Sequence, residues 1–384
     1  MVWWIICASF WTNSDEGGPR PRVGAEPPPG GAVGGCPACR RAERMIPPAT
    51  RARADALLAR FLDAGAARVD PPILLPAGPL LDLYGEDIRA RAFTTTDPLR
   101  GEAMLRPDFT VPVAQAHDPA LGPAAYAYAG EVFRRQEDDE SRPREYLQVG
   151  LERLGGTDRA AEDAAVFAAF HDVLAPDGPT ARVGDLGLLL AAVDALHTTA
   201  RRRAALRRHV WRPARFRRLL DRFTHPAPRP AAPDADAPLV GLRTADEIAA
   251  RHAALAEEAR TPPLDPGQAA TLEALIDMDL PLPEGLDRVD ALAAAMPDLA
   301  PAAAALRARA RAVAARGVDL AALRFAPTTR RSAMEYYDGF TFTFAMDGET
   351  VATGGRYDAL TAALGHPVPA VGGVVRPGLL GDAP

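Results

Sequence analysis

Apolar and polar side chains follow two different periods along this chain, and these periods separate predicted helices from predicted strands. Between residues 49 and 67 the apolar positions recur every three or four residues, which predicts a helix. Residues 161–175 and 186–196 are also predicted to be helices. Strict alternation at Phe340–Phe344, then Asp347-Gly348 and a second short run, predicts a β-hairpin, because Asp-Gly favours its tight turn.

Shorter runs complete a predicted sheet. They lie at residues 103–105, 126–133, 145–154, 180–183, 323–326 and 370–375. Residues 72–83, where Ile73, Leu74 and Leu75 stand among prolines, are predicted to form a short buried strand and a loop. Since hairpin-linked strands lie apart from the helices along the chain, we predict an α+β fold with an antiparallel sheet flanked by helices.

Composition divides the chain into parts. From 200 to 318 it is mostly Ala, Arg, Leu and Pro, which predicts an all-helical insert between the core segments 45–199 and 319–384. The arrangement of the helices in the insert is left open. Residues 1–44 are rich in Gly, Pro and Arg after a short apolar start, so we expect a disordered N-terminal extension and take Met45 as the true start.

Charge and rare residues exclude several kinds of chemistry. The formal net charge is −6 and all 44 basic residues are arginine, which excludes a P-loop or Schiff-base lysine. Cys7, Cys36 and Cys39 are the only cysteines, so no disulfide scaffold is expected, and without a histidine cluster we expect neither a metal nor a cofactor. Residues 2–6 are too short to span a bilayer and lack a signal's basic start, so a cytoplasmic protein without a membrane partner is expected.

Polar side chains alternate along the predicted strand at 145–154. Gln148, Gly150 and Glu152 then share one face, because neighbouring side chains of a strand point to opposite faces. Gly150 has no side chain, so we expect a gap there at which a small ligand can approach.

Further polar groups are predicted to join this face. The same period-two spacing puts Asp108 and Thr110 together, and Arg134 follows the strand at 126–133. Carboxylates and an amide oxygen accept from an ammonium group and an arginine binds a carboxylate, so the set suits an amino acid. Exposed strand residues with ordinary ion pairs explain the same pattern without a ligand.

Five motifs make the sequence similar to a known family. They are LRPDFT at 105–110, GEVFRRQ at 130–136, REYLQVGLE at 144–152, EYYDG at 335–339 and GGRYD at 354–358. Their order and separations resemble those of histidyl-tRNA synthetases, over about residues 50–198 and 320–376. The resemblance implies the class II aminoacyl-tRNA synthetase core, an antiparallel sheet with flanking helices.

The sequence also departs from the synthetase pattern. Gln136 stands where the family has a glutamate for adenine, and Ser332 stands where it has the arginine that activates histidine. The third motif, at 374–378, lacks its acidic residue, and we expect no anticodon-binding domain after it. Because adenylation needs fixed cations around the phosphate, we expect no catalytic residues for that reaction.

A core with these losses resembles the regulatory subunit of ATP phosphoribosyltransferase. The resemblance implies a non-catalytic protein of histidine biosynthesis that activates the short-form catalytic subunit and mediates feedback by L-histidine. It also implies self-association as a dimer and a hetero-octamer with the catalytic subunit. The alternatives are an active histidyl-tRNA synthetase and an RNA-binding sensor derived from it.

The resemblance also implies a candidate histidine site. Its residues are Asp108, Thr110, Arg134, Gln148, Glu152 and Tyr337. The aspartate, threonine and glutamine would hold the α-ammonium group, the arginine would meet the carboxylate, and the glutamate and tyrosine would read the imidazole. A site at a subunit interface is the alternative, and the surface that meets the catalytic subunit is left open.

An arginine-rich segment begins the predicted insert. Residues 201–222 contain ten arginines against one acidic residue, Asp221. We interpret them as a solvated helix face and expect no nucleic acid partner. An RNA-binding or partner-docking helix is the alternative.

Overall fold

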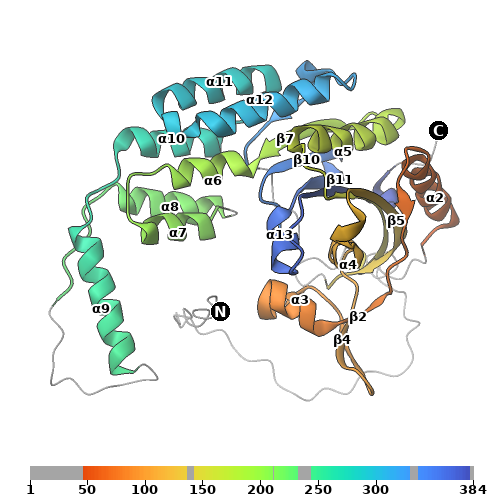
Figure 1. Cartoon of the computed structure of the whole chain (residues 1–384), viewed down its shortest axis with the longest axis horizontal. Helices are drawn as coiled ribbons and strands as arrows, with labels where there is room; N and C mark the ends of the chain where they lie inside the picture. The colour runs from red at the N-terminus through yellow and green to blue at the C-terminus, as the bar shows by residue number, and fades with distance from the viewer. Residues whose placement is uncertain (1–45, 136–141, 211, 232–243, 329–335, 381–384) are drawn as a thin grey trace, which may run out of the picture.

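The computed structural model describes residues 46–135, 142–210, 212–231, 244–328 and 336–380. The predicted extension at 1–44 lies outside these ranges, and so do Gln136 and Ser332, two of the positions that depart from the synthetase pattern. Figure 1 shows a sheet-containing core at one end of the molecule and a group of helices at the other.

Within the described ranges, a nine-stranded sheet forms the centre of the core. Its strands in spatial order are β1 (Ala67–Arg68), β5 (Ala124–Phe133), β6 (Glu145–Leu154), β12 (Ala370–Val375), β11 (Glu349–Arg356), β10 (Phe340–Met346), β7 (Thr180–Asp185), β9 (Arg324–Phe325) and β8 (Leu280–Pro281). Neighbouring strands are antiparallel except for β1 with β5 and β7 with β9. The predicted α+β fold is confirmed, with these two parallel pairs as the difference.

The hairpin of β10 and β11 turns at the predicted Asp-Gly pair. Asp347 has φ 50° and Gly348 has φ 83°, and a two-residue type I′ turn requires positive φ at both central positions. Before the turn, Phe340, Phe342 and Phe344 alternate with threonines, so their rings all point to one face of the sheet.

Two helices cover that face. They are α2 (Pro48–Asp63) and α5 (Arg159–Leu174). The ring of Phe167 on α5 lies 5.7 Å from that of Phe342 and 5.5 Å from that of Phe344, and Phe61 of α2 packs 5.1 Å from Phe170. Burial of these large rings stabilises the packing of both helices on this side of the sheet.

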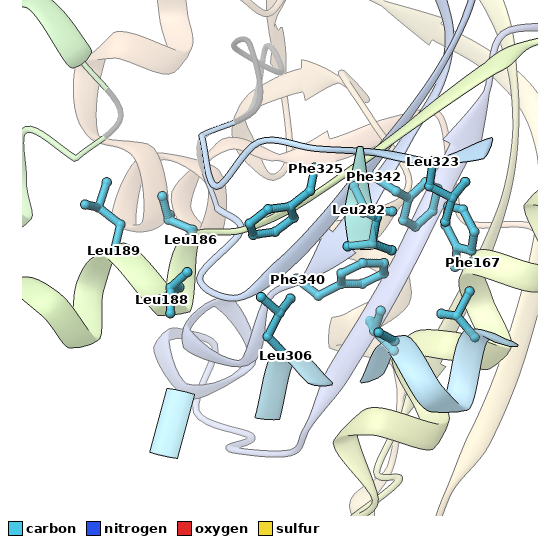
Figure 2. Packing of buried hydrophobic residues seen from close by; sticks show 14 of the residues in the cluster. Phe167, Leu186, Leu188, Leu189, Leu282, Leu306, Leu323, Phe325, Phe340 and Phe342 are labelled. Carbon is cyan, nitrogen blue, oxygen red and sulfur yellow. The ribbon is translucent and has the colours of Figure 1, made fainter. Parts of the chain in front are cut away.

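The chain between β7 and β9 is mostly helical and joins the same core. Its helices are α6 (Leu186–Asp194), α7 (Ala200–Arg208), α8 (Pro213–Phe223), α9 (Ala245–Arg260), α10 (Pro266–Asp277), α11 (Leu282–Ala295) and α12 (Ala300–Ala314). Figure 2 shows Leu282, Leu306 and Phe340, which belong to one cluster of buried apolar residues. The expectation of an all-helical insert is wrong at β8, a two-residue strand that pairs with β9. The pairing gives hydrogen-bond partners to backbone groups that β9 would otherwise expose at the edge of the sheet.

A smaller sheet lies on the opposite side of the core, in the order β2 (Leu74–Pro76), β4 (Gly101–Leu105) and β3 (Thr94–Asp97). The helices on this side are α3 (Ala77–Tyr84), α4 (Thr110–Ala116) and α13 (Asp358–Ala363). The prediction of a loop in 72–83 is wrong from Ala77 onwards, where α3 forms. Pro79 does not prevent this helix, because it falls in the first turn, where a backbone N–H has no acceptor within the helix. Ile73 and Leu74 are also 44% and 42% exposed rather than buried.

Short 3₁₀ segments connect these elements. They are Gly85–Ala90, Pro119–Leu121, Ala175–Asp177, Pro297–Leu299, Leu320–Ala322 and Pro377–Leu379. Among the helices of the described ranges, none is long and apolar enough to cross a membrane.

Candidate functional site

The candidate site lies on the face of the large sheet opposite α2 and α5. The strand β6 has the bounds predicted from its alternation, so Gln148, Gly150 and Glu152 share one face. Val149 and Leu151 point the other way, into the core with α2 and α5. The polar face of β6 is therefore turned towards the smaller sheet and α4.

Three hydroxyl groups hold the carboxylate of Glu152. Thr110 Oγ1 and the hydroxyl of Tyr128 donate to its Oε1 at 2.8 and 2.9 Å, and the hydroxyl of Tyr357 donates to its Oε2 at 2.6 Å. The side chain has no exposed surface. Burial disfavours the charged form and raises the pKa of Glu152 to about 7, although all three hydroxyl donors act to lower it.

Two glycines make room for this arrangement. A Cβ on Gly150 would lie 2.3 Å from the ring and hydroxyl of Tyr128, and a Cβ on Gly372 of β12 would lie 1.5 Å from Oε2 of Glu152. The prediction that a ligand can approach at Gly150 is therefore wrong, because the side chain of Tyr128 from the neighbouring strand β5 fills the space. Close approach of a side chain is the reason for glycine at both positions.

Asp108 and Thr110 come to the site from a loop and a helix. The prediction that they share a strand face is wrong, because β4 ends at Leu105 and Thr110 is the first residue of α4. Pro107 has no backbone N–H to donate to a neighbouring strand, which favours the end of β4 just before it. The loop still brings both residues to Glu152: Thr110 bonds it directly, and Asp108 is near enough for its charge to act on the glutamate.

Among the residues that the structure describes, two buried acceptor atoms of the site have no hydrogen-bond partner. Asp108 Oδ1 accepts from the N–H of Val111 at 3.4 Å, but its Oδ2 accepts no hydrogen bond, and neither does Oε1 of Gln148. Burial raises the pKa of Asp108, and the charge of Arg134 opposes that rise. An unsatisfied buried polar atom costs about 1–3 kcal/mol, so both atoms favour a ligand that carries N–H donors.

The two remaining predicted residues also reach this side of the sheet. Arg134 follows β5, and its Nε donates to the carbonyl of Pro107 at 2.8 Å, directly beside Asp108. The buried Tyr337 ring lies 4.7 Å from the ring of Tyr336, and burial together with the charge of Glu152 raises the pKa of Tyr337 above its usual value. The structure thus brings all six predicted residues to one region, and their binding of histidine stays a prediction.

Comparisons with known proteins identify the family of this chain. A family model for histidyl-tRNA synthetase matches residues 45–378. An ATP phosphoribosyltransferase regulatory subunit from Allorhizobium ampelinum is 34% identical over 357 residues, which cover 83% of this chain and 94% of that relative. A regulatory subunit of the same name from Rhizobium johnstonii is 32% identical over 356 residues, 83% of this chain and 94% of the relative. The chain belongs to the ATP phosphoribosyltransferase regulatory subunit family.

A solved structure shows that the regulatory-subunit chain has the predicted class II fold. The structure of an ATP phosphoribosyltransferase regulatory subunit/histidyl-tRNA synthetase from Bacillus halodurans C has a TM-score of 0.65. It is 19% identical and covers 89% of this chain and 81% of its own, so it establishes the fold alone. The family resemblance and the synthetase-like fold predicted from the motifs are both confirmed.

Sequence reasoning missed two tyrosines that this family member places around Glu152. Tyr357 lies in the GGRYD motif, which marked the segment without giving the side chain a role. Tyr128 stands directly opposite Gly150 in the β5–β6 pair, so the hairpin register would have placed it on the polar face. The spacing of residues within one strand does not show how that strand is aligned with its neighbour.

A buried ion-pair network ties α12 to the core of this regulatory-subunit chain. Arg309 of α12 donates to Asp163 Oδ2 at 2.7 Å and to Asp185 Oδ2 at 2.6 Å, and Arg356 Nε donates to Asp163 Oδ1 at 2.9 Å. Because Arg356 directly precedes Tyr357, the network also anchors the end of β11 that delivers the tyrosine to Glu152. Within the described residues, no group of three or more His, Cys, Asp or Glu side chains is arranged to hold a metal.

Proposed function

We propose that this chain is a non-catalytic regulatory subunit that activates the short-form catalytic subunit of ATP phosphoribosyltransferase and makes it sensitive to histidine. Membership of the regulatory subunit family supports this role. The residues at Gln136 and Ser332 support the absence of histidine activation, because both differ from the synthetase pattern. A dimer of this chain within a hetero-octamer is part of the proposal.

The observation that carries the proposed histidine site is the pair of buried acceptors without partners. An α-ammonium group between Asp108 Oδ2 and Gln148 Oε1 would satisfy both, and its positive charge would stabilise the ionised carboxylate of Asp108. Arg134 is the cation placed beside Asp108, and we assign it to the carboxylate of the ligand. The amino acid would thus bring charges of both signs to partners of opposite sign.

The imidazole of the ligand is assigned to Glu152 and Tyr337. An ionised carboxylate offers about four lone-pair positions, and three hydroxyl groups use three of those on Glu152. One position is left for an imidazole N–H. The hydroxyl groups hold the carboxylate in place before the ligand arrives, so little ordering is needed when histidine binds.

Calorimetric titration of the full chain with histidine tests the site. Replacement D108N removes the charge that faces the ammonium, and we expect binding to weaken by roughly tenfold or more, as for hydrogen bonds to charged groups. The exposed Asp63 at the end of α2 supplies the matched control D63N, which should bind as the wild type does. Equal affinity of wild type and D108N would place histidine elsewhere.

Reconstitution tests the regulatory role. Addition of the chain to the short-form catalytic subunit should raise phosphoribosyl transfer to ATP and confer inhibition by histidine, and sedimentation should show a complex larger than either part. The chain alone should give no histidine-dependent ATP–pyrophosphate exchange. Measurable exchange would overturn the non-catalytic assignment in favour of a synthetase.

A further inference from the structure

The helical hairpin of α7 and α8 has one apolar and one strongly basic side. Phe216, Leu220 and Phe223 of α8 are buried, at the spacing of one helix face. Arg215 and Arg218 lie on the other side of α8, three residues apart, and are exposed. Figure 1 shows the hairpin within the group of helices away from the large sheet.

Four of the ten arginines in 201–222 have internal or paired positions. Arg202 is 1% exposed, donates to Glu258 at 2.8 Å and to the carbonyl of Pro262, and stacks over the ring of Phe223. The interpretation of the whole segment as a solvated face is wrong for this residue, because its guanidinium fills a polar niche between α7 and α9. The other three are Arg203, bonded to backbone carbonyls, Arg207, paired with Asp194, and Arg217, paired with Asp277.

The remaining arginines form an unpaired basic surface. They are Arg201, Arg208, Arg212, Arg215, Arg218 and Arg222. In the part of the chain that the structure describes, none of these six has a carboxylate partner. Burial lowers the pKa of His209, and the positive charges of the nearby Arg215, Arg212 and Arg208 lower it further. We call Arg208, Arg212, Arg215 and Arg218 the α7–α8 arginine face.

Such a face carries an electrostatic cost that a partner can offset. Like charges three or four residues apart on a helix destabilise it by about 0.2–0.5 kcal/mol per pair. The cost arises in a protein whose formal net charge is −6, so the positive charge is local and not a property of the whole surface. A surface that presents carboxylates would turn this repulsion into attraction, and guanidinium groups match carboxylates with two parallel hydrogen bonds.

The observations favour a folded protein over a nucleic acid as the partner. Binding of single-stranded nucleic acid combines cations with exposed aromatic rings for base stacking, whereas the phenylalanines in the part of the hairpin that the structure describes, Phe216 and Phe223, are buried. The face is also compact, because an 11-residue helix such as α8 is only about 16 Å long. The net negative charge of the chain would repel a long polyanion beyond that patch.

We propose that the α7–α8 arginine face is the docking surface for a carboxylate-rich surface of the catalytic subunit, an inference that rests on the regulatory function proposed above. The triple replacement R208E/R215E/R218E tests it, because all three side chains are exposed and their reversal leaves the buried apolar face of α8 intact. The matched control is R251E/R288E/R311E, three exposed arginines on α9, α11 and α12. Three reversals of two charges each take the formal charge from −6 to −12 in both variants.

The affinity of each full-length chain for the short-form catalytic subunit is measured by calorimetry at low and at physiological salt. We expect the R208E/R215E/R218E complex to be roughly tenfold or more weaker than the wild-type complex, and the control complex to be within about twofold of it. The salt dependence of the wild-type complex should be reduced in the test variant only. Unchanged melting curves by circular dichroism establish that both variants are folded.

The outcomes separate this inference from the proposed function. If R208E/R215E/R218E binds the catalytic subunit as tightly as the wild type does, the docking surface is wrong and the regulatory role stands. The same conclusion follows if the test and control variants lose affinity equally. Absence of any wild-type complex overturns the regulatory role and the docking surface with it. Binding of tRNA that R208E/R215E/R218E abolishes, while the protein complex is unaffected, assigns the face to nucleic acid and overturns the inference.

Discussion

The hydroxyl of Tyr357 donates a 2.6 Å hydrogen bond to Oε2 of Glu152, and this bond joins the end of β11 to the C-terminal part of β6 across the intervening strand β12. The only β12 residue directly opposite Glu152 is Gly372, whose missing side chain lets the two groups meet. A carboxylate that would otherwise be buried without donors is therefore fixed from two directions, by Tyr357 on one oxygen and by Tyr128 and Thr110 on the other.

Loss of the Tyr357 hydroxyl should weaken the binding of histidine. Replacement Y357F keeps the ring and removes one of the three donors that hold the Glu152 carboxylate in place before the ligand binds. The carboxylate must then be ordered on binding, which costs about 0.5–1.5 kcal/mol per side chain, so we expect a rise in Kd of roughly two- to tenfold. Calorimetric titration measures this. The control is D63N at the exposed end of α2, which should leave Kd as in the wild type.

The stability of the folded chain should depend on pH through Glu152. Its pKa is raised from 4.5 to about 7, so the folded protein holds the proton more tightly than the unfolded chain does. The resulting stabilisation is complete below about pH 4.5 and is lost as the pH rises through 7, by up to about 3 kcal/mol.

Denaturant unfolding of wild type and E152Q without histidine, from pH 5 to 8, measures this contribution. Asp338 also has a raised pKa, and the comparison cancels its effect because both proteins contain it. The stability of the wild type relative to E152Q should fall as the pH rises. Two parallel stability curves would show that Glu152 does not titrate in this range.

The predictable part of this fold is the part that short-range periodicity encodes. The alternation from Glu145 to Leu154 gave β6 with its bounds, and Asp347-Gly348 gave the hairpin with its turn, because both signals lie within a few residues of each other. The face shared by Gln148 and Glu152 followed from the same period. Motif similarity then supplied Tyr337, which no period connects to that face.

The unpredicted part depends on pairing between distant segments. Tyr128 reaches Glu152 because β5 and β6 pair in one particular register, and Thr110 reaches it because a loop turns into α4 rather than continuing β4. Arg202 is buried, although the preceding Arg201 is exposed, because α9 places Glu258 beside it, 56 residues later in the chain. Registers and helix contacts of this kind are set by packing of the whole core.

Removal of the Arg309 guanidinium should destabilise the protein strongly. R309M leaves Asp185 without its buried ionic partner and Asp163 with Arg356 alone, and the loss of one member of a buried pair costs about 3–5 kcal/mol. The control is R307M, two residues earlier on α12, which breaks partly exposed pairs with Asp287 and Asp290. We expect that change to cost less than about 1 kcal/mol. Denaturant unfolding of both variants measures the difference, and equal losses would contradict it.

A methyl group at position 372 should displace the carboxylate of Glu152 from the site. The Cβ of G372A would lie 1.5 Å from Oε2 of Glu152 and 2.8 Å from the backbone carbonyl of Leu151, so the carboxylate must leave its place beside Tyr357. Overpacking of this kind costs about 1–3 kcal/mol of stability, and the displaced carboxylate should also lose histidine binding. The control G78A adds a methyl group with no atom within 4 Å, in the helix α3, where alanine is favoured over glycine. Thermal melting and histidine titration of both variants measure the two effects, and wild-type binding by G372A would show that Glu152 takes no part in the site.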